Sequence, residues 1–469
     1  MRRLIGVSML YMASATGQRI VAAFVTFWLA TRLSTIDYGR YGLGLALQQL
    51  VTIVALGGII ELVIGRMRTL EDGPVRSALF ASARRAFLLM AVFIFALLAV
   101  WFGLTANKGI EIAEGMSAVA AGTMFGYASM VAALARLEER HSVAIVYSTL
   151  PTTISYLSGV VAILLLNTVW SFFFGAALGG GLVVVILRYM GGQSSRTPAE
   201  AVSATSPWPL LAMSVPYFGV TLFGWLSGFG YNFVIDHFFV KEEIARFTFA
   251  LSIASMLLMV ASALNQVWSP RFYQLATRMP VATLEVANRA FHSVLSVVMG
   301  VLGGAMVLAY PVALHLLGAK LAAYADMQAD VAVLVAGYVV LPAWWQCMNH
   351  LLSGGQGGLL FRVTAVSGAL GIAAGIGLLL LLGSTGIYLS FVLTMVLRAS
   401  VISLAVRQSV AVSPPVLGIS VGLILIAVAF LISRRVDPLF AQIAAYLAAS
   451  TLFVVIAIRD DLRRCAAVW

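Results

Sequence analysis

The sequence predicts an all-α, polytopic membrane protein of about 14 transmembrane helices, within a range of 12–14. Hydrophobic residues make up 61% of the chain and charged residues 10%, against about 45–50% and 25% in soluble domains. The apolar residues fall in blocks that repeat along the whole chain, each with roughly the 17–25 residues that cross a bilayer as a helix. Strand-like alternation is absent from these blocks, which favours a helical bundle over a barrel.

Fourteen apolar blocks give the predicted helices in chain order. They cover residues 9–31, 41–65, 86–106, 112–135, 143–166, 169–190, 211–236, 247–270, 291–317, 329–352, 360–382, 386–406, 416–433 and 438–458. The fourth and fifth blocks are the least apolar, because they are rich in small and polar residues. No segment between blocks exceeds about 20 residues, so the sequence predicts no soluble domain.

The amino terminus, Met1-Arg2-Arg3 ahead of an apolar run, has the pattern of a secretory signal. We interpret it as the first membrane span, because the run continues past Ala13-Ser14-Ala15 for the length of a span. The two cysteines, Cys347 and Cys465, do not make a disulfide framework, and no metal-ligating residues accompany either of them in the sequence. No metal and no cofactor is therefore expected.

The formal net charge of +11 follows the predicted topology. With the amino terminus in the cytoplasm, twenty of the 29 lysines and arginines fall in inner segments and eight in outer ones. This is the positive-inside bias of membrane proteins. It predicts an even number of helices with both termini cytoplasmic. It also assigns the basic charge to topology and anionic-lipid contact, and not to nucleic acid.

One arginine, Arg19, lies inside an apolar run, Val7 to Ala30. A charge at the middle of a spanning helix costs on the order of 2.5 kcal/mol or more, so such residues usually face a cavity or a substrate. Arginine also carries the planar donor fork that suits phosphate. A structural pair with Glu61, near the inner end of the second helix, is the alternative, and a pair that breaks on substrate binding would combine both roles.

The chain is predicted to form two similar halves. The polar segment Gly191–Pro209 separates six helices from eight, and a shift of 206 residues places DYGRY at 37–41 over EIARF at 243–247. Both motifs lie at the outer end of the first hairpin of a half, which indicates a parallel repeat with a substrate path between the halves. The expected organisation is an N-lobe at 1–190, a cytoplasmic linker at 191–210, a C-lobe at 211–406, and two additional helices with a cytoplasmic tail at 407–469.

Polar and small residues follow one face of the first and seventh predicted helices. We interpret these faces as lining the gap, although tight helix packing produces the same pattern. Other polar residues are open between cavity lining and bonds between helices. The predicted substrate-binding residues are Arg19, Thr26, Gln48, Trp225, Asn232, Asn265 and Gln266. The cluster of Trp344, Trp345, Gln346, Asn349 and His350 is predicted to be an interfacial belt or an inner gate, and His292 and His315 are interpreted as incidental.

Three motifs carry a resemblance to a known family: LSTIDYGRYGLGLAL at 33–47, FVIDHFFVKEEIARFTFALSIAS at 233–255 and LNQVWSPRFYQLA at 264–276. They resemble the polysaccharide and O-antigen flippases of the multidrug/oligosaccharidyl-lipid/polysaccharide exporter superfamily. The resemblance implies two six-helix lobes in a V around a central, often cationic, cavity, working by alternating access in a bacterial inner membrane. This chain departs from it in showing only Arg19 deep in a helix.

The expected function is export of a polyprenyl-pyrophosphate-linked oligosaccharide across the membrane for surface polysaccharide assembly, without enzymatic activity. The expected partners are this lipid-linked glycan, membrane lipids and the assembly machinery. No GxxxxGK[ST] motif is present, so the chain is expected to have no ATP site of its own. Gating or charge-pair roles are predicted for Glu61, Asp37, Arg40, Asp236, Glu243 and Arg246, through ion pairs that close the outer mouth.

Three alternatives stay open at this stage. A drug/cation antiporter of the same superfamily needs a carboxylate deep in a helix, whereas Glu61 and Asp236 lie near predicted helix ends. A lipid II flippase is chemically close to the favoured function. A membrane glycan polymerase or ligase needs a larger outer loop with an acid/base pair.

Overall fold

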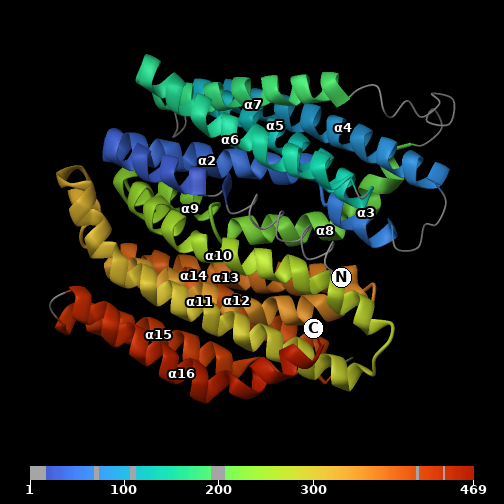
Figure 1. Cartoon of the computed structure of the whole chain (residues 1–469). Coiled ribbons are helices and arrows are strands. Elements are labelled where there is room, and N and C mark those ends of the chain that lie inside the picture. The colour runs from blue at the N-terminus through green and yellow to red at the C-terminus, as the bar shows by residue number, and fades with distance from the viewer. Residues whose placement is uncertain are drawn as a thin grey trace. The chain divides into compact units, whose positions relative to one another are not determined.

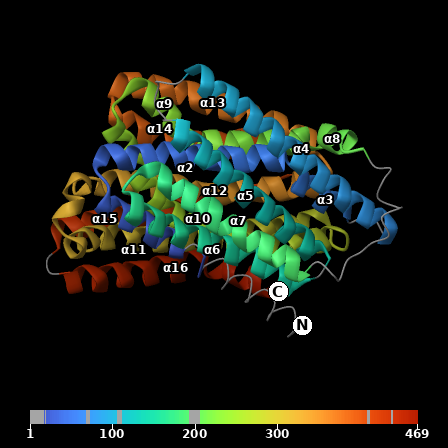
Figure 2. The ribbon, with the colours of Figure 1, turned by 90° about the horizontal axis from the view of Figure 1, so that it is seen from above.

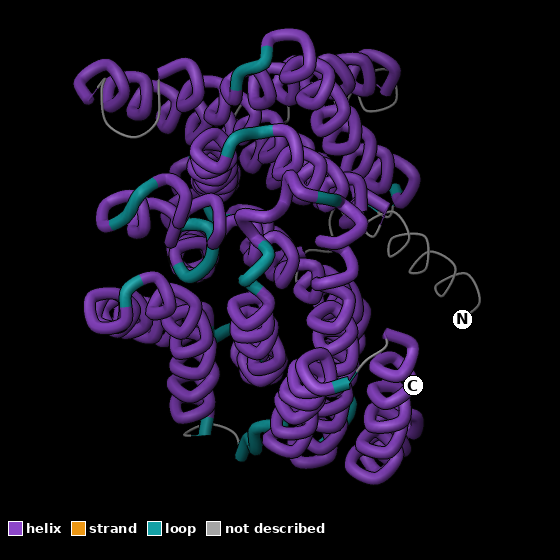
Figure 3. The backbone as a smooth tube through the Cα atoms, turned by 90° about the vertical axis from the view of Figure 1, so that its left-hand side faces the viewer, coloured by secondary structure: helices purple, strands orange, loops and turns teal. Residues whose placement is uncertain are grey.

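The computed structural model describes residues 17–18, 20–67, 73–105, 112–138, 140–191, 206–407, 411–436 and 439–468. Throughout these ranges the chain forms helices joined by short loops and contains no strand (Figure 3). In hydrocarbon, where water cannot satisfy the backbone, helices bond every internal N–H and C=O within one segment. The predicted all-α class is confirmed.

The chain divides by its internal contacts into two compact units, and the helices of each unit are labelled in Figure 1. Unit 1 comprises the residues up to Leu29 together with Leu33–Ala245. Its helices are α2 (Thr35–Leu56), α3 (Ile59–Met67), α4 (Gly73–Thr105), α5 (Ile112–Leu137), α6 (His141–Leu166), α7 (Val169–Gly191), α8 (Trp208–Leu226) and α9 (Tyr231–Phe238).

Unit 2 comprises Ala30–Arg32 and Arg246–Trp469, and α10 (Lys241–Ala276) runs into it from unit 1. Its other helices are α11 (Val281–Leu317), a 3-10 turn η2 (Ala319–Tyr324), α12 (Gln328–Ser353), α13 (Gly357–Leu382), α14 (Ser384–Val406), α15 (Val416–Arg435) and α16 (Leu439–Val468). Helices α8 and α9, part of the predicted C-lobe at 211–406, belong by their contacts to unit 1. The predicted lobes stay a prediction.

The described residues contain twelve helices that are long and apolar enough to span a membrane. A thirteenth candidate, Leu439–Val455 with Ile458–Arg464, is bent by 59°. A shorter apolar helix at Ile20–Arg32 coincides with the predicted first span, part of which lies outside the described residues. The number of spans therefore falls within the predicted range.

Several predicted helix boundaries are wrong: α4 begins at Gly73 and α11 at Val281, ahead of the predicted starts at 86 and 291. The predicted span at 211–236 is interrupted by a turn at Ser227–Gly230, which separates α8 from α9. The predicted outer turns at 32–40 and 237–246 are mostly helical, because α2 begins at Thr35 and α10 at Lys241. These two starts differ by 206 residues, which is the same shift that aligns the DYGRY and EIARF motifs.

Small residues let the helices of unit 1 approach closely. Helices α6 and α7, side by side in Figure 1, are joined by Ser158, whose hydroxyl donates to the carbonyl of Gly175 at 2.8 Å. On α2, the Thr52 hydroxyl donates to the carbonyl of Gly122 on α5 at 2.9 Å. Within hydrocarbon, where apolar burial adds little, such close packing and interhelical hydrogen bonds hold helices together.

Small residues and an interhelical hydrogen bond also join the last two helices, α15 and α16, to α11 in unit 2. Helices α11, α15 and α16 pack together (Figure 2), and Gly300 of α11 faces Gly422 of α15 so closely that a Cβ on Gly300 would overlap its backbone. From α16, the Tyr446 hydroxyl donates to the carbonyl of Val301 at 2.8 Å. The two additional helices predicted within 407–469 therefore pack along α11.

Candidate functional site

Two predicted substrate-binding residues meet one face of α2 within unit 1. The indole Nε1 of Trp225 donates to the carbonyl of Ala46 at 3.0 Å, and Nδ2 of Asn232 donates to the carbonyl of Gly42 at 3.0 Å. Gly42 and Ala46 are one helical turn apart, so both side chains bond the same face of α2. Trp225 and Asn232 are buried. In this structure they join helices to each other, and their role toward a substrate stays a prediction.

The turn between α8 and α9 positions these two side chains. The N–H groups of Gly228 and Gly230 both donate to the carbonyl of Trp225, at 3.0 and 2.9 Å. A Cβ on Gly230 would stand 2.9 Å from the Trp225 ring, so the ring folds back over a position that only glycine fills. Phe233 packs on the same ring, with centroids 6.0 Å apart.

The predicted binding residue Gln48 lies on α2. Gln48 is buried on α2, and its side-chain amide has no hydrogen-bond partner among the residues that the structure describes. By contrast, the Thr26 hydroxyl donates to the carbonyl of Ala22 at 2.9 Å, which is a bond within its own helix. Among the predicted lining residues that the structure describes, Gln48 therefore has a buried side-chain amide available for a hydrogen bond.

Three predicted binding residues remain: Arg19, Asn265 and Gln266. Arg19 lies outside the described residues, as does the side chain of Gln266. Asn265 is buried on α10, where its Oδ1 accepts a bond of 3.4 Å from the Ser269 hydroxyl. That hydroxyl also donates to Oδ1 of Asn349 on α12 at 3.1 Å, so Asn265 is tied into a polar cluster of unit 2.

The predicted gating residues of unit 1 form local pairs. Asp37 completes the cap of α2, since its N–H donates to the Ser34 hydroxyl at 3.1 Å, and Arg40 lies 4.0 Å from its carboxylate. Asp236 forms an ion pair with Lys241 across the turn between α9 and α10. Such pairs near a surface are worth about 0–1 kcal/mol each, so they break and re-form easily.

The predicted gating residue Arg246 bonds within unit 2. Its guanidinium donates to both carboxylate oxygens of Asp326 at 2.9 Å. This hydrogen bond holds the pKa of the exposed Asp326 carboxyl below its usual value. Glu61 is exposed and Glu243 is half-buried, and neither forms an ion pair with a side chain that the structure describes. The predicted gate itself stays a prediction.

A buried network of polar side chains on α11 and α12 was not predicted from the sequence. Oε2 of Glu285 lies 2.6 Å from Nε2 of His350. Its Oε1 accepts from Nε2 of Gln346 at 2.7 Å and from the N–H of Ser413 at 3.2 Å. The Gln346 amide also donates to the carbonyl of Ser413 at 3.0 Å. The carboxylate therefore fixes the segment that leads into α15.

The network continues through Asn288, which accepts from Nε1 of Trp268 at 3.0 Å and donates to the carbonyl of Gln346 at 3.1 Å. His292 is wholly buried beside it, with Nδ1 2.8 Å from the carbonyl of Asn288 in its own helix, and its interpretation as incidental stays a prediction. A signal was present in the sequence. Glu285, Asn288 and His292 share one helical face, as do Gln346, Asn349 and His350. The predicted start of this helix at 291 left Glu285 outside it.

A second arginine lies buried in a helix, which corrects the view that only Arg19 does. Arg398 of α14, one of the twenty basic residues assigned from the sequence to inner segments, is 7% exposed. It lies about two helical turns before the end of α14 at Val406. Its guanidinium stands over the Trp344 ring at 4.7 Å. An aromatic face attracts a cation and offsets part of the cost of burying it. Trp344 thus has a packing role inside unit 2.

Within the described part of the chain, no group of three His, Cys, Asp or Glu side chains is placed to hold a metal ion. The polar groups found there are amides, hydroxyls, indoles and guanidinium groups, with Glu285 as the buried carboxylate of the network. Such groups bind by hydrogen bonding and charge.

A family model described as "Polysaccharide biosynthesis protein" matches residues 29–326. No curated protein matches the chain. Among solved structures, the chain is similar to the lipid II flippase MurJ in an inward closed conformation. The two are 12% identical, with 96% of this chain and 99% of that one covered, at a TM-score of 0.62. It is also similar to the MATE multidrug transporter DinF-BH in complex with R6G: 13% identity, 87% and 95% coverage, TM-score 0.64. At these identities the likeness shows the fold.

Replacing Glu285 with alanine is expected to destabilise unit 2. The substitution removes the acceptor for Gln346 and Ser413 and the partner of His350, and breaking a buried pair in this way costs about 3–5 kcal/mol. Thermal unfolding of the detergent-purified protein, followed by loss of helical circular dichroism, measures the effect. Glu285→Gln, which keeps the Oε1 acceptor, should lose less. Glu242→Ala, at the start of α10, is the control. Equal midpoints for Glu285→Ala and Glu242→Ala would contradict the network.

Proposed function

The chain belongs to the family of polysaccharide biosynthesis proteins, in the multidrug/oligosaccharidyl-lipid/polysaccharide exporter superfamily, and on this basis we propose that it exports a lipid-linked glycan. The proposed substrate is a polyprenyl-pyrophosphate-linked oligosaccharide, moved from the cytoplasmic to the outer leaflet by alternating access. The proposed place is a bacterial inner membrane, with both termini cytoplasmic. The observation that carries the proposal is the family match over residues 29–326.

The physical problem is the polar head of the substrate. A pyrophosphate and several sugars cannot cross hydrocarbon unaided, because each unsatisfied polar group there costs several kcal/mol. A protein that offers hydrogen bonds to the head, while the polyprenyl tail stays among lipids, removes most of this cost. Gln48 supplies a free amide for the sugars, and Arg19 supplies a charged fork for phosphate.

The ion pairs near the starts of α2 and α10 suit a transport cycle. Asp37 with Arg40 is a long pair near the start of α2, Asp236 with Lys241 is a half-buried pair at the start of α10, and Arg246 binds both carboxylate oxygens of the exposed Asp326. We propose that they exchange partners, together with Glu61 and Glu243, as these helix ends move. A substrate then shifts the equilibrium by binding one arrangement better than the other.

The deciding experiment is lipid extraction from cells depleted of this protein, with the sidedness of each lipid determined. We expect a polyprenyl-pyrophosphate oligosaccharide to accumulate in the cytoplasmic leaflet while surface polysaccharide is lost. Cells that regain the protein from a plasmid are the control. Accumulation in the outer leaflet would contradict export and indicate a polymerase or ligase. Accumulation of lipid II would indicate a lipid II flippase, as MurJ is, and no accumulation would favour drug transport, as by the MATE multidrug transporter.

Arg19→Ala is expected to abolish export while the protein stays inserted and abundant. The reason is loss of the proposed phosphate donor inside the membrane. Export is measured as surface polysaccharide per copy of the protein in the membrane. Arg19→Lys, which keeps the charge without the planar fork, should retain part of the activity. Normal export by Arg19→Ala would exclude the phosphate role.

Trp225 separates sugar stacking from helix packing. Trp225→Ala should weaken export to a degree that depends on the glycan, because aromatic stacking differs among sugars. Trp225→Phe keeps a ring but loses the bond to the Ala46 carbonyl. If stacking matters, the Phe variant should export better than the Ala variant. Equal losses in both variants for every glycan would assign Trp225 to packing alone.

A further inference from the structure

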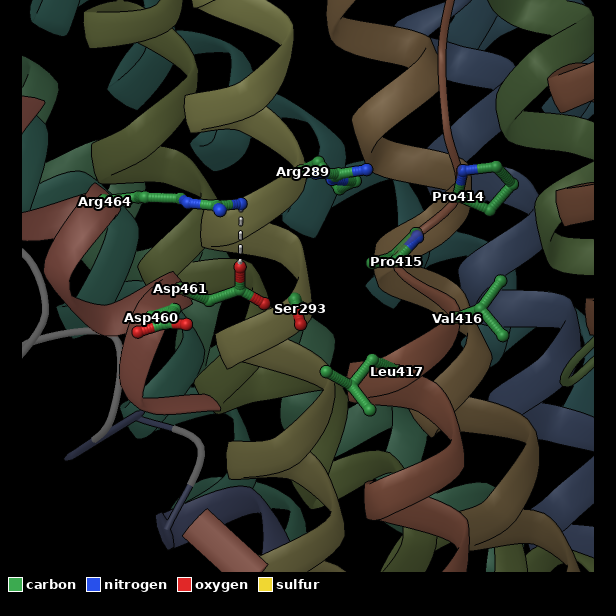
Figure 4. A pocket seen from close by; sticks show the side chains of 9 residues that line it. All are labelled: Arg289, Ser293, Pro414, Pro415, Val416, Leu417, Asp460, Asp461 and Arg464. Atoms are coloured by element: carbon green, nitrogen blue, oxygen red, sulfur yellow. Dashed lines mark ion pairs between the residues drawn. The ribbon is translucent and has the colours of Figure 1, made fainter. Parts of the chain in front are cut away.

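One end of unit 2 contains a cavity of about 420 Å³ (Figure 4). Its walls come from three helices: Arg289 and Ser293 of α11, the segment Pro414–Leu417 at the start of α15, and Asp460, Asp461 and Arg464 near the end of α16. This volume is within the range of about 300–1,000 Å³ found for ligand sites. None of these residues was singled out as a functional residue from the sequence.

The α15 wall is held in place from behind. Ser413 directly precedes the lining residues, and its N–H and carbonyl are bonded by Glu285 and Gln346 of the buried network. Gly418, in the first turn of α15, lies so close to the backbone of Ser293 that a Cβ there would overlap it. The cavity therefore has a preorganised wall, which lowers the entropy cost of binding.

This wall and the neighbouring face of α11 attract negative charge. At the amino end of the 20-residue helix α15, the N–H of Val416 donates to the carbonyl of Pro414 at 2.8 Å, so Leu417 and Gly418 supply the N–H groups of the first turn that could meet an anion. The guanidinium of Arg289 lines the cavity and forms no ion pair with any described residue. Ser293 is 2% exposed, and its hydroxyl, which also lines the cavity, has no hydrogen-bond partner in the described structure. These three groups suit a phosphate.

The α16 wall has the opposite character. Asp460 and Asp461 line it, as Figure 4 shows on the side of the cavity away from Pro414 and Pro415. Each carboxylate has an arginine one turn on, at 3.9 Å: Arg463 for Asp460 and Arg464 for Asp461. The pair of Asp460 is exposed and that of Asp461 is half-buried, and ion pairs at this distance are weak. A cationic group with several N–H donors can therefore compete for these carboxylates.

We propose that this cavity binds the phosphoethanolamine head group of a membrane phospholipid. The phosphate would lie against Arg289, Ser293 and the amino end of α15, and the ammonium against Asp460 and Asp461. The formal charges of the lining side chains cancel, since Arg289 on α11 and Arg464 on α16 balance Asp460 and Asp461. A zwitterion matches this arrangement better than a purely anionic head group, whose phosphate would meet the carboxylates without an ammonium to pair with them.

The surroundings of the cavity suit a lipid. Two lining residues of α15, Val416 and Leu417, have more than half of their surface exposed, and the exposed Leu462 follows the lining Asp461 in the sequence of α16. The exposed Arg459 and Arg463 lie in the same turns of α16. Apolar and charged side chains meet in this way at the boundary between hydrocarbon and head groups. Acyl chains would extend from the cavity along the apolar surfaces of α15 and α16.

Native mass spectrometry of the full-length protein tests the proposal. The protein is released from vesicles of phosphatidylcholine mixed with equal amounts of phosphatidylethanolamine and phosphatidylglycerol, and the retained lipids are identified. Wild type should retain phosphatidylethanolamine in preference to phosphatidylglycerol. Arg289→Gln should reduce its retention on the order of tenfold, through loss of a charge-assisted bond to phosphate. Replacing Asp460 and Asp461 with asparagine together should reverse the preference toward phosphatidylglycerol.

Arg435→Gln, an exposed arginine at the far end of α15, is the matched control and should behave as wild type. Thermal unfolding of each variant in the same detergent identifies any that fail to fold. If Arg289→Gln fails, the asparagine variant still decides between the two lipids. Equal retention by Arg289→Gln and Arg435→Gln would overturn the proposal, as would a wild type that prefers phosphatidylglycerol. The lipid-retention experiment does not measure glycan export, so its outcome does not depend on whether the proposed export function is correct.

Discussion

The structure depends on one constraint: inside a bilayer, backbone N–H and C=O groups find no water and must be bonded by the protein. Helices meet this constraint over most of the described chain, and the exceptions are covered by packing. Gly57 and Gly58, which have positive φ angles of 54° and 70°, separate α2 from α3. A Cβ on Gly58 would overlap the backbone of α8 at Phe218, so another helix covers this break directly. The turn at Ser227–Gly230 bonds its own N–H groups to the carbonyls of α8.

The same constraint explains how polar side chains are used. Each one placed in a span needs a partner, and the nearest partners are carbonyls of neighbouring helices or other polar side chains. Trp225 and Asn232 use the carbonyls of α2, whereas Glu285, Gln346 and His350 bond to one another. A polar stripe in a membrane helix therefore has two uses, packing and binding. A residue such as Gln48, which keeps a free amide, is better suited to meet a substrate.

The two proposed functions belong to different parts of the chain. Family membership rests on residues 29–326 and concerns the glycan. The head-group cavity rests on α11, α15 and α16, largely beyond that match. If a lipid occupies this cavity, α15 and α16 do more than pack against α11, since they contribute two of the three walls of a binding site. The buried Glu285 network then has a purpose, because it fixes the wall that would hold the phosphate.

The sequence by itself determined the fold class, the range of spans and the family. Apolar block length and composition are local properties, and the cost of burying charge in lipid acts on each block separately. It also placed polar residues on helical faces, as with Gln346, Asn349 and His350. Only the tertiary structure decided what those faces meet, because a hydrogen bond between helices depends on their rotation and offset. That Trp225 bonds Ala46, that Glu285 bonds His350, and that Arg398 lies over Trp344 follow from packing between segments far apart in the chain.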